Sequence, residues 1–302
     1  MNCRFKNILI KERALMKTLL KRSMLVLPLM MSLSLANPAE SASGVVMDFG
    51  AVDTLVVLDK TDAIAALPMN NLPKYLGNID TANMKDGGGM KDPNVELYAE
   101  IKPGFIVISP RLGGRVEELS KYAPVLNFTA NADDYYASVQ KNIVELGKLI
   151  DAEDQANKAL KELDQKLTEI QKEIAQSDKR ALVMMHNAGN TFAASESDRG
   201  QFVHEFMGVK KADNDPQERQ AIDAEYLNKV QPDVLYIVDR SSAIGQDPLD
   251  VAVFTKEVVS NAKTKDGKEI NVVYLDPTLW YLSGNGLMSM EIQAKEVLEG
   301  LK

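Results

Sequence analysis

Two arginines occupy equivalent positions in a long-range internal repeat. In each copy a glutamate lies seven residues before a proline and an arginine lies eight residues after it; the copies are Glu96, Pro103, Arg111 and Glu225, Pro232, Arg240. A guanidinium group stays charged at any working pH, and it binds anionic oxygens through two donors or stacks on aromatic rings. A single arginine is usually solvated or salt-bridged, but a repeated position favours a role in binding an anionic ligand.

The segments between each glutamate and arginine predict how the arginines are positioned. A short helical stretch ends at the proline, and an apolar run follows at 105–108 in the first copy and 234–238 in the second. These runs are continuous rather than alternating, which is typical of strands buried on both faces of a parallel sheet. Ligands of open α/β sheets bind outside the carboxyl ends of the strands. We therefore expect two similar α/β lobes that direct both arginines into one cleft.

Three further residues are expected at the edge of this cleft. Arg199 follows the strand expected at 181–185, the first of the second lobe. The segment 276–286 follows another buried strand and contains Trp280, the only tryptophan, next to Tyr281. Such aromatic side chains stack on ligand rings, and a tyrosine offers its phenol oxygen to a hard metal. Trp280 and Tyr281 are both candidate ligand-binding residues. We expect one of the two rings to lie in the core and the other to face the ligand. The alternative is a packed loop with Trp280 in the core.

The repeated glutamates suggest a second kind of site. Glu96 and Glu225 each lie near the start of the short helix that precedes the strand. A carboxylate there interacts favourably with the helix dipole by about 0.3–1 kcal/mol, which is the simpler explanation. The paired spacing favours instead one exposed carboxylate on each lobe, arranged as a two-point docking site for a two-fold symmetric partner.

Other kinds of chemistry lack the residues they need. His186 and His204 are the only histidines and Cys3 is the only cysteine, so a metal site made by the protein alone is not expected. His204 lies in a helical stretch, where a structural imidazole is expected. The glycine runs at 87–89 and 284–286 lack a phosphate-loop pattern, and no nucleophile elbow is present. We therefore predict no enzyme and no intrinsic cofactor; iron, if handled, arrives already chelated.

The start of the chain resembles a targeting segment. Basic residues precede the apolar run 24–35, which is too short to span a bilayer and is typical of a signal peptide. We predict a signal peptide over 1–36, with Met16 as an alternative start and an uncleaved anchor helix as the alternative structure. Cys3 lies ahead of the apolar run and cannot be a lipid-bearing cysteine at the cleavage point. The expected product is a free periplasmic protein.

The mature chain is strongly acidic and is predicted to have two lobes. Removing 1–36 leaves 28 basic and 42 acidic residues, a net charge of −14, which argues against nucleic acid as a partner. We predict an N-terminal α/β lobe at 44–150, an interlobe helix at 151–177 and a C-terminal α/β lobe at 178–302. The predicted fold class is therefore α/β, with two doubly wound lobes, sheets of parallel type and one long bridging helix.

The interlobe helix is predicted from the spacing of its apolar residues, which recur in steps of four and three at Ala156, Leu160, Leu163, Leu167, Ile170 and Ile174. They form one stripe over about 24 residues, roughly 36 Å at the helical rise. A coiled coil is the alternative. We prefer a single rigid helix packed along both lobes, which predicts small motions on ligand binding.

Several segments resemble the periplasmic ferric-siderophore-binding proteins of ABC importers, the class III substrate-binding proteins. The likeness is specific to the branch that binds ferric catecholates such as enterobactin and vibriobactin. The segments that carry it are 48–55, 70–76, 108–111, 202–206, 237–240 and 280–284.

This resemblance implies a shallow ligand cleft between two lobes, a monomeric receptor and delivery to an inner-membrane permease dimer. A family tyrosine that ligates iron matches Tyr281, and the family's permease-docking glutamates match Glu96 and Glu225. The arginines that face the triply negative tris-catecholate complex match Arg111, Arg199 and Arg240.

The chain departs from the family pattern in two places. Relatives usually begin with a β-hairpin before the strand that matches 45–47, and some supply an iron-ligating histidine in the loop that matches 214–221, where this chain has none. The second departure favours a siderophore that saturates iron itself or leaves one site for Tyr281. The alternatives are a haem or cobalamin receptor of the same fold and, from another class, a two-lobed periplasmic enzyme.

Overall fold

The structure is a computed structural model that describes residues 43–194, 198–216 and 219–302. The predicted signal peptide over 1–36 lies outside these residues. Within them, no helix combines the length and the apolar character needed to cross a membrane.

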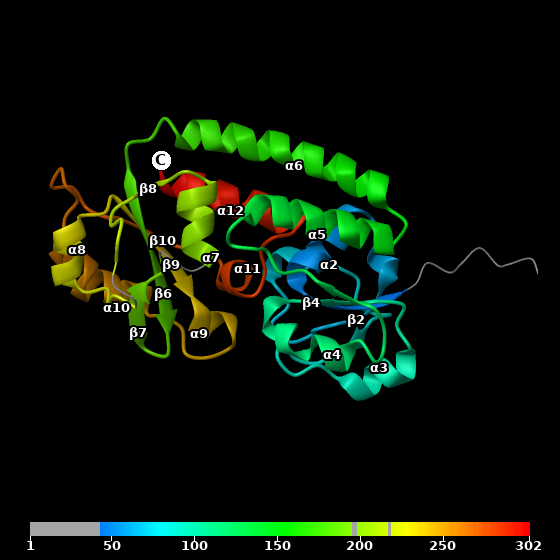
Figure 1. Ribbon diagram of the computed structural model, residues 1–302. Coiled ribbons are helices and arrows are strands. Elements are labelled where there is room, and N and C mark those ends of the chain that lie inside the picture. Colours follow the sequence, from blue (N-terminus) through cyan, green and yellow to red (C-terminus); the bar gives the residue numbers. More distant parts are fainter. Residues whose placement is uncertain (1–42, 195–197, 217–218) are drawn as a thin grey trace, which may run out of the picture. The chain divides into compact units, whose positions relative to one another are not determined.

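The N-terminal lobe is built on a parallel five-stranded sheet with the strand order β3-β2-β1-β4-β5. Two of its strands, β2 and β4, are labelled in Figure 1. Every residue of β1 and β4 is buried, as the continuous apolar runs predicted. The strand order reverses between β1 and β4, and such a switch point is where ligands bind in open α/β sheets. The strands are β1 Gly44–Met47, β2 Ile64–Leu67, β3 Lys85–Asp86, β4 Ile106–Ile108 and β5 Val125–Asn127.

Helices and short helical turns connect these strands. The first helix begins where the side chain of Asp48 accepts a hydrogen bond from the backbone N–H of Ala51, which is N-capping of the usual kind. The α-helices are α2 Phe49–Val57, α3 Val95–Ile101, α4 Val116–Leu119 and α5 Tyr135–Leu149, and the shorter turns are η1 Thr61–Ala63, η2 Lys74–Leu76 and η3 Pro110–Arg115.

The C-terminal lobe has a mixed sheet in the order β10-β9-β6-β7, with β8 also paired to β6. All pairs are parallel except β6 with β7, which forms a hairpin that the sequence analysis did not predict. The hairpin turn is Ala188-Gly189, with φ of 50° and 80°, and two positive values suit a tight two-residue turn. The strands are β6 Arg180–Asn187, β7 Asn190–Ala193, β8 Lys210–Lys211, β9 Val234–Asp239 and β10 Asn271–Tyr274.

The helices of this lobe are mostly short. The segment that contains His204 is a π-helix rather than an α-helix, and it ends before Gly208, whose φ is 80°. The elements are α7 Asp198–Gly200, η4 Gln201–Phe206, α8 Ala224–Val230, α9 Arg240–Ala243, α10 Val251–Glu257, η5 Val259–Asn261, α11 Pro277–Tyr281 and α12 Leu287–Gly300.

The long helix α6, Glu153–Ile174, follows α5 after a break at Asp151, which has φ of 53°. Its buried residues are the six of the predicted apolar stripe, so that prediction is confirmed. The helix lies against α5 and α12 (Figure 1). Lys166 of α6 forms an ion pair of 2.6 Å with Glu291 of α12. The helix α12 of the C-terminal lobe also packs against α2 of the N-terminal lobe, so the two lobes share contacts besides α6. The predicted lobe boundaries at 150 and 177 stay a proposal.

The internal repeat has the same local structure in both lobes. The side chains of Asn94 and Asp223 cap α3 and α8, each accepting from the backbone N–H three residues later. Both helices end at a residue in the left-handed conformation, Lys102 with φ of 50° and Gln231 with φ of 49°. A buried strand follows each helix, so both copies bring their arginine to the carboxyl end of a strand.

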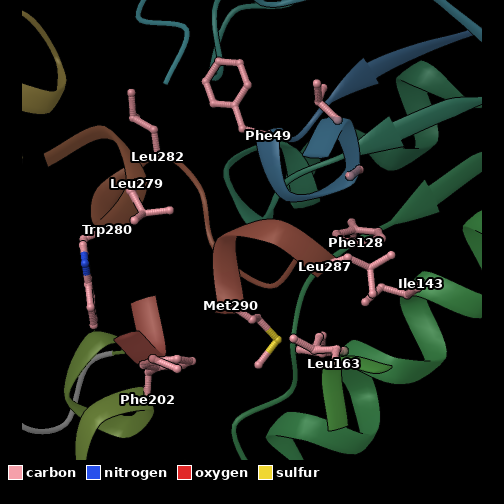
Figure 2. Packing of buried hydrophobic residues seen from close by; sticks show 14 of the residues in the cluster. Phe49, Phe128, Ile143, Leu163, Phe202, Leu279, Trp280, Leu282, Leu287 and Met290 are labelled. Atoms are coloured by element: carbon pink, nitrogen blue, oxygen red, sulfur yellow. The ribbon is translucent and has the colours of Figure 1, made fainter. Parts of the chain in front are cut away.

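One cluster of buried apolar side chains extends through both lobes. It includes Phe49 and Phe128 of the N-terminal lobe, Trp280 of the C-terminal lobe and Met290 of α12 (Figure 2). Burial of such side chains is the main source of stability in a fold of this kind. The helix α12 therefore contributes to a core that belongs to both lobes.

Candidate functional site

The three predicted arginines come from three separate elements. Arg111 lies in η3, three residues after the end of β4, and Arg240 is the first residue of α9, directly after β9. Asp239 caps α9 by accepting a hydrogen bond from the backbone N–H of Ser242, which fixes the start of that helix. Arg199 lies in α7.

All three arginines contact Tyr281. The guanidinium carbons of Arg111 and Arg199 lie 5.0 Å from the centre of the Tyr281 ring, and that of Arg240 lies 5.5 Å away. Cation–π attraction operates within about 6 Å of a ring centre. The structure thus brings the arginines of both lobes to one aromatic ring.

Hydrogen bonds to Tyr281 reinforce these contacts. Arg240 donates from Nε to the Tyr281 hydroxyl at 2.8 Å. Arg111 and Arg199 donate from Nη2 to its backbone carbonyl at 2.5 Å and 2.9 Å. Tyr281 therefore accepts hydrogen bonds from all three cations through two different oxygens.

Among the described residues, Arg111 and Arg240 form no ion pair with a carboxylate. Arg240 also donates to the Oδ1 atom of Asn187, and none of the ion pairs formed among the described residues includes Arg111 or Arg240. Like charges this close repel one another, most strongly in a partly buried environment of low dielectric constant. The arrangement therefore favours an anion among the guanidinium groups.

The cavity at this place is small. Its volume is about 60 Å³, and its walls include Arg111, Arg199, Tyr281, Tyr135 and Ser283. Pockets for small ligands usually measure about 300–1,000 Å³. The space enclosed among these side chains is therefore smaller than such ligands need.

The surroundings of Tyr281 change its acidity. Burial alone would raise the pKa of its phenol, but the hydrogen bond from Arg240 and the charges of Arg111 and Arg240 outweigh burial and lower the pKa. The cations therefore stabilise the phenolate form, which is an oxygen ligand suited to a hard metal ion.

Trp280 contributes to the site through its backbone only. Its ring is 1% exposed, stacks edge-on against Phe202 at 5.6 Å and donates from Nε1 to Glu296 at 2.5 Å. Its carbonyl accepts a hydrogen bond from Nε of Arg199 at 3.0 Å. Of the two aromatic residues, Trp280 is thus the core ring, and its place among the ligand-contacting side chains needs correction.

Two wall residues were missed by the sequence analysis. Asp48, the N-cap of α2, is 8% exposed; burial raises its pKa to about 6, although its hydrogen bonds and the charge of Arg111 act in the opposite direction. Tyr135 donates its hydroxyl to Oδ1 of Asn285 at 2.6 Å. Asp48 had a detectable signal, because it directly follows a buried strand, whereas the partner of Tyr135 is far away in the sequence.

The predicted docking glutamates lie on the surface. Glu96 and Glu225 are both exposed, and each is the second residue of its helix, α3 or α8. Neither belongs to an ion pair formed within the described part of the chain. Their role in docking stays a prediction.

The histidines have structural partners. His186 is buried, with Nδ1 2.8 Å from Oδ1 of Asp239, and Nδ1 of His204 lies 2.9 Å from the carbonyl of Val209. Burial lowers the pKa of His204. Across the ranges that the structure describes, no three His, Cys, Asp or Glu residues are grouped so as to hold a metal ion.

Comparisons with known proteins agree with one another. The family model described as periplasmic binding protein matches residues 41–279. The petrobactin-binding protein YclQ of Bacillus subtilis is 35% identical over 271 residues, which cover 88% of this chain and 84% of that protein. Its crystal structure matches with a TM-score of 0.79 and covers 86% of this chain and 92% of that chain.

Two further similar proteins are named for the compounds that they bind. The ferric-anguibactin-binding protein FatB of Vibrio anguillarum is 29% identical over 264 residues, covering 84% of this chain and 80% of that protein. The structure of the periplasmic catecholate-siderophore-binding protein VctP of Vibrio cholerae matches with a TM-score of 0.73 at 25% identity, covering 85% of this chain and 92% of that chain.

Proposed function

Because this chain belongs to the periplasmic binding protein family and has its two-lobed class III fold, we propose that it captures a ferric catecholate siderophore for an ABC importer. Proteins of this family bind a substrate outside the cytoplasm, and the chain is a binding protein rather than an enzyme. The predicted signal peptide over 1–36 makes the periplasm the proposed location.

The observation that carries this proposal is the contact of three guanidinium groups with one tyrosine. Arg111, Arg199 and Arg240 surround Tyr281, and a ferric tris-catecholate offers a compact, triply negative surface of oxygens and aromatic rings. Guanidinium groups bind such oxygens through charge-assisted hydrogen bonds and stack on the rings. On binding, the arginines exchange the oxygens of Tyr281 for those of the ligand.

Relatives support the class of ligand rather than one compound. The names of similar proteins mention petrobactin, ferric anguibactin and catecholate siderophores. The proposal is therefore a ferric siderophore with catecholate groups; enterobactin and vibriobactin are members of that class to be tested. Iron is cargo in this proposal, and the siderophore supplies most of its ligands.

We further propose that Tyr281 can complete the coordination of iron. The lowered pKa of its phenol favours loss of the proton, and the hydroxyl already lies beside Arg240 in the site. A phenolate would bind iron only where the siderophore leaves a coordination position open. A siderophore that fills all positions would instead contact Tyr281 through ring stacking.

The proposal is tested by titrating the protein with a ferric tris-catecholate while following the fluorescence of Trp280, the only tryptophan. Replacing Arg111, Arg199 or Arg240 by alanine removes a charge-assisted contact of about 1.5–3 kcal/mol, so affinity should fall by about 10- to 100-fold. The matched control is Arg115→Ala, because Arg115 lies in η3 but pairs with Glu118 and does not line the cavity.

Unchanged affinity in all three variants would contradict the proposed mechanism. Native mass spectrometry against siderophores with and without iron, and against haem and cobalamin, identifies the ligand class. Binding of haem or cobalamin in place of every ferric siderophore would favour the alternative receptor of the same fold.

A further inference from the structure

The helix α12 begins in direct contact with α2 of the N-terminal lobe. A Cβ atom on Gly50 would lie 2.1 Å from the carbonyl oxygen of Gly284, and one on Gly286 would lie 2.2 Å from Oδ1 of Asp53. Only glycine allows backbones to approach this closely. We call this contact between α2 and residues 284–289 the α2–α12 seam.

Asp53 is the centre of the α2–α12 seam. Its side chain is fully buried and accepts hydrogen bonds from the backbone N–H groups of Met288 at 3.0 Å and Ser289 at 3.1 Å. The hydroxyl of Tyr75 donates to the same carboxylate at 3.1 Å. The first turn of a helix has N–H groups without partners inside the helix, and a carboxylate from another lobe satisfies two of them here.

The seam is connected to Tyr281 on both sides. Towards the start of α12, the hydroxyl of Tyr75 also contacts the hydroxyl of Ser283, two residues after Tyr281. Further along α12, Glu296 accepts the hydrogen bond from the indole of Trp280, the residue before Tyr281. The residues on either side of Tyr281 are therefore held by Tyr75, the partner of Asp53, and by α12, whose first turn Asp53 binds.

We propose that Asp53 is a positioning residue for the arginine site: by fixing the first turn of α12 to α2, it holds Tyr281 where arginines of both lobes reach it. Arg111 belongs to the N-terminal lobe, whereas Arg199, Arg240 and Tyr281 belong to the C-terminal lobe. Without an interlobe anchor, the distance between Arg111 and the other cations would not be fixed. Asp53 does not line the cavity and acts through α12.

Two variants of Asp53 differ in how many acceptor oxygens they keep, and so test the role of its carboxyl group. Burial raises the pKa of Asp53 to about 7, although its hydrogen bonds act in the opposite direction. Asp53 accepts through both oxygens, Oδ1 from Met288 and Oδ2 from Ser289 and Tyr75, whereas a carboxamide of similar shape keeps only one acceptor oxygen. Asp53→Asn should therefore keep part of the seam, whereas Asp53→Ala removes both acceptors and leaves a cavity.

The first experiment needs no ligand. The emission of Trp280 reports the packing of α11 beside Tyr281, so Asp53→Ala should shift it to longer wavelength and increase quenching by acrylamide. The control Val259→Ala lowers stability through a separate core cluster and should leave the emission unchanged. Asp53→Asn, which keeps one of the two acceptor oxygens, should lie between the unmodified protein and Asp53→Ala. An unchanged Trp280 signal in folded Asp53→Ala overturns the proposal.

The second experiment measures ligand affinity and rests on the proposed function. With a ferric tris-catecholate, Asp53→Ala should lose affinity by about tenfold or more, since small displacements of binding groups have effects of this size. Val259→Ala should bind normally, and Asp53→Asn should lose less affinity than Asp53→Ala because it keeps one acceptor oxygen. Equal affinity of Asp53→Ala and Val259→Ala overturns the positioning role.

The outcomes separate this inference from the proposed function. If the unmodified protein binds no ferric catecholate, the proposed function fails, while the Trp280 emission still decides the role of Asp53. If Asp53→Ala does not fold, Tyr75→Phe replaces it, because this variant removes only the hydroxyl shared by Asp53 and Ser283. An unchanged emission and affinity in Tyr75→Phe would then count against the seam.

Discussion

At the scale of single residues, Tyr281 occupies the hydrogen-bond donors of the arginines that the proposed ligand would use. Its hydroxyl and carbonyl accept hydrogen bonds from the cations that the proposed siderophore would bind, and its ring faces the same guanidinium groups. Arg111 and Arg240, which form no ion pair within the described residues, are held in the site by these contacts. Tyr281 thus keeps the cations together in the ligand-free protein, at the cost of contacts that the ligand has to replace.

Tyr281→Phe separates the ring of this residue from its oxygen. With a ferric tris-catecholate, whose iron is fully coordinated, we expect affinity to fall by less than about threefold, well below the value of one charge-assisted hydrogen bond. The reason is that the proposed ligand replaces the hydroxyl as the partner of Arg240. With a ferric bis-catecholate, whose iron has open positions, we expect a loss of about tenfold or more, together with loss of the visible phenolate-to-iron absorption band. Titrations followed by absorption measure both.

The control for this prediction is Tyr122→Phe, since Tyr122 packs edge-on against Tyr98 away from the cavity. It should bind both complexes as the unmodified protein does. Equal losses for the two iron complexes in Tyr281→Phe would mean that Tyr281 acts through its hydrogen bond with Arg240 and does not ligate iron.

At the scale of helices and strands, the start of α12 should make stability depend on pH. Burial raises the pKa of Asp53 to about 7, above the ordinary value of about 3.9. The folded protein therefore holds this proton more tightly than the unfolded chain does. The contribution to the free energy of unfolding is fully present below about pH 4 and is lost as the pH rises to about 7.

Asp53→Asn removes this titration and isolates its effect. We expect the Tm of Asp53→Asn, relative to that of the unmodified protein, to be higher at pH 8 than at pH 5. Thermal unfolding at constant ionic strength measures the difference. Asp48 has a pKa raised to about 6 and acts in the same direction in both proteins, so it cancels. A Tm difference that is constant across this pH range would disprove the titration of Asp53.

Elements with local signals were predictable from the sequence. The stripe of α6 follows from spacing alone, and the repeat predicts α3 with β4 and α8 with β9, because each is a short helix, a proline and a buried run. Strand β7 was missed, since its turn depends on two positive φ values and only one of the residues is glycine.

The site was predictable only where residues repeat or resemble a family. Arg111 and Arg240 carry both signals, whereas Arg199 and Tyr281 depend on their place after a strand and on the resemblance. Asp53 lies in the segment 48–55 that carries the resemblance, but its role had no signal in the sequence, because the two N–H groups of α12 that it binds are more than 200 positions away. Such contacts exist only once the chain is folded.

At the scale of the whole molecule, the two lobes share more than a linker. The helix α6 packs against α5 and α12, α12 packs against α2, and one apolar cluster includes residues of both lobes. Wide separation of the lobes would break these contacts and expose apolar surface. A stable arrangement of the lobes would also keep exposed groups on each lobe at a fixed spacing.

A fixed spacing is what the proposed docking of Glu96 and Glu225 to a two-fold symmetric permease requires. Both carboxylates are exposed at the same position of repeated helices. Reversing both charges, in Glu96→Arg with Glu225→Arg, should leave siderophore affinity unchanged, since neither residue lines the cavity. Transport of iron by cells or by permease vesicles should fall by about tenfold or more, because like charges placed across an interface cost several kcal/mol.

The control for this prediction is Glu117→Arg, which reverses another exposed glutamate and should leave transport normal. Full transport by the double variant would place the permease contact elsewhere on the molecule.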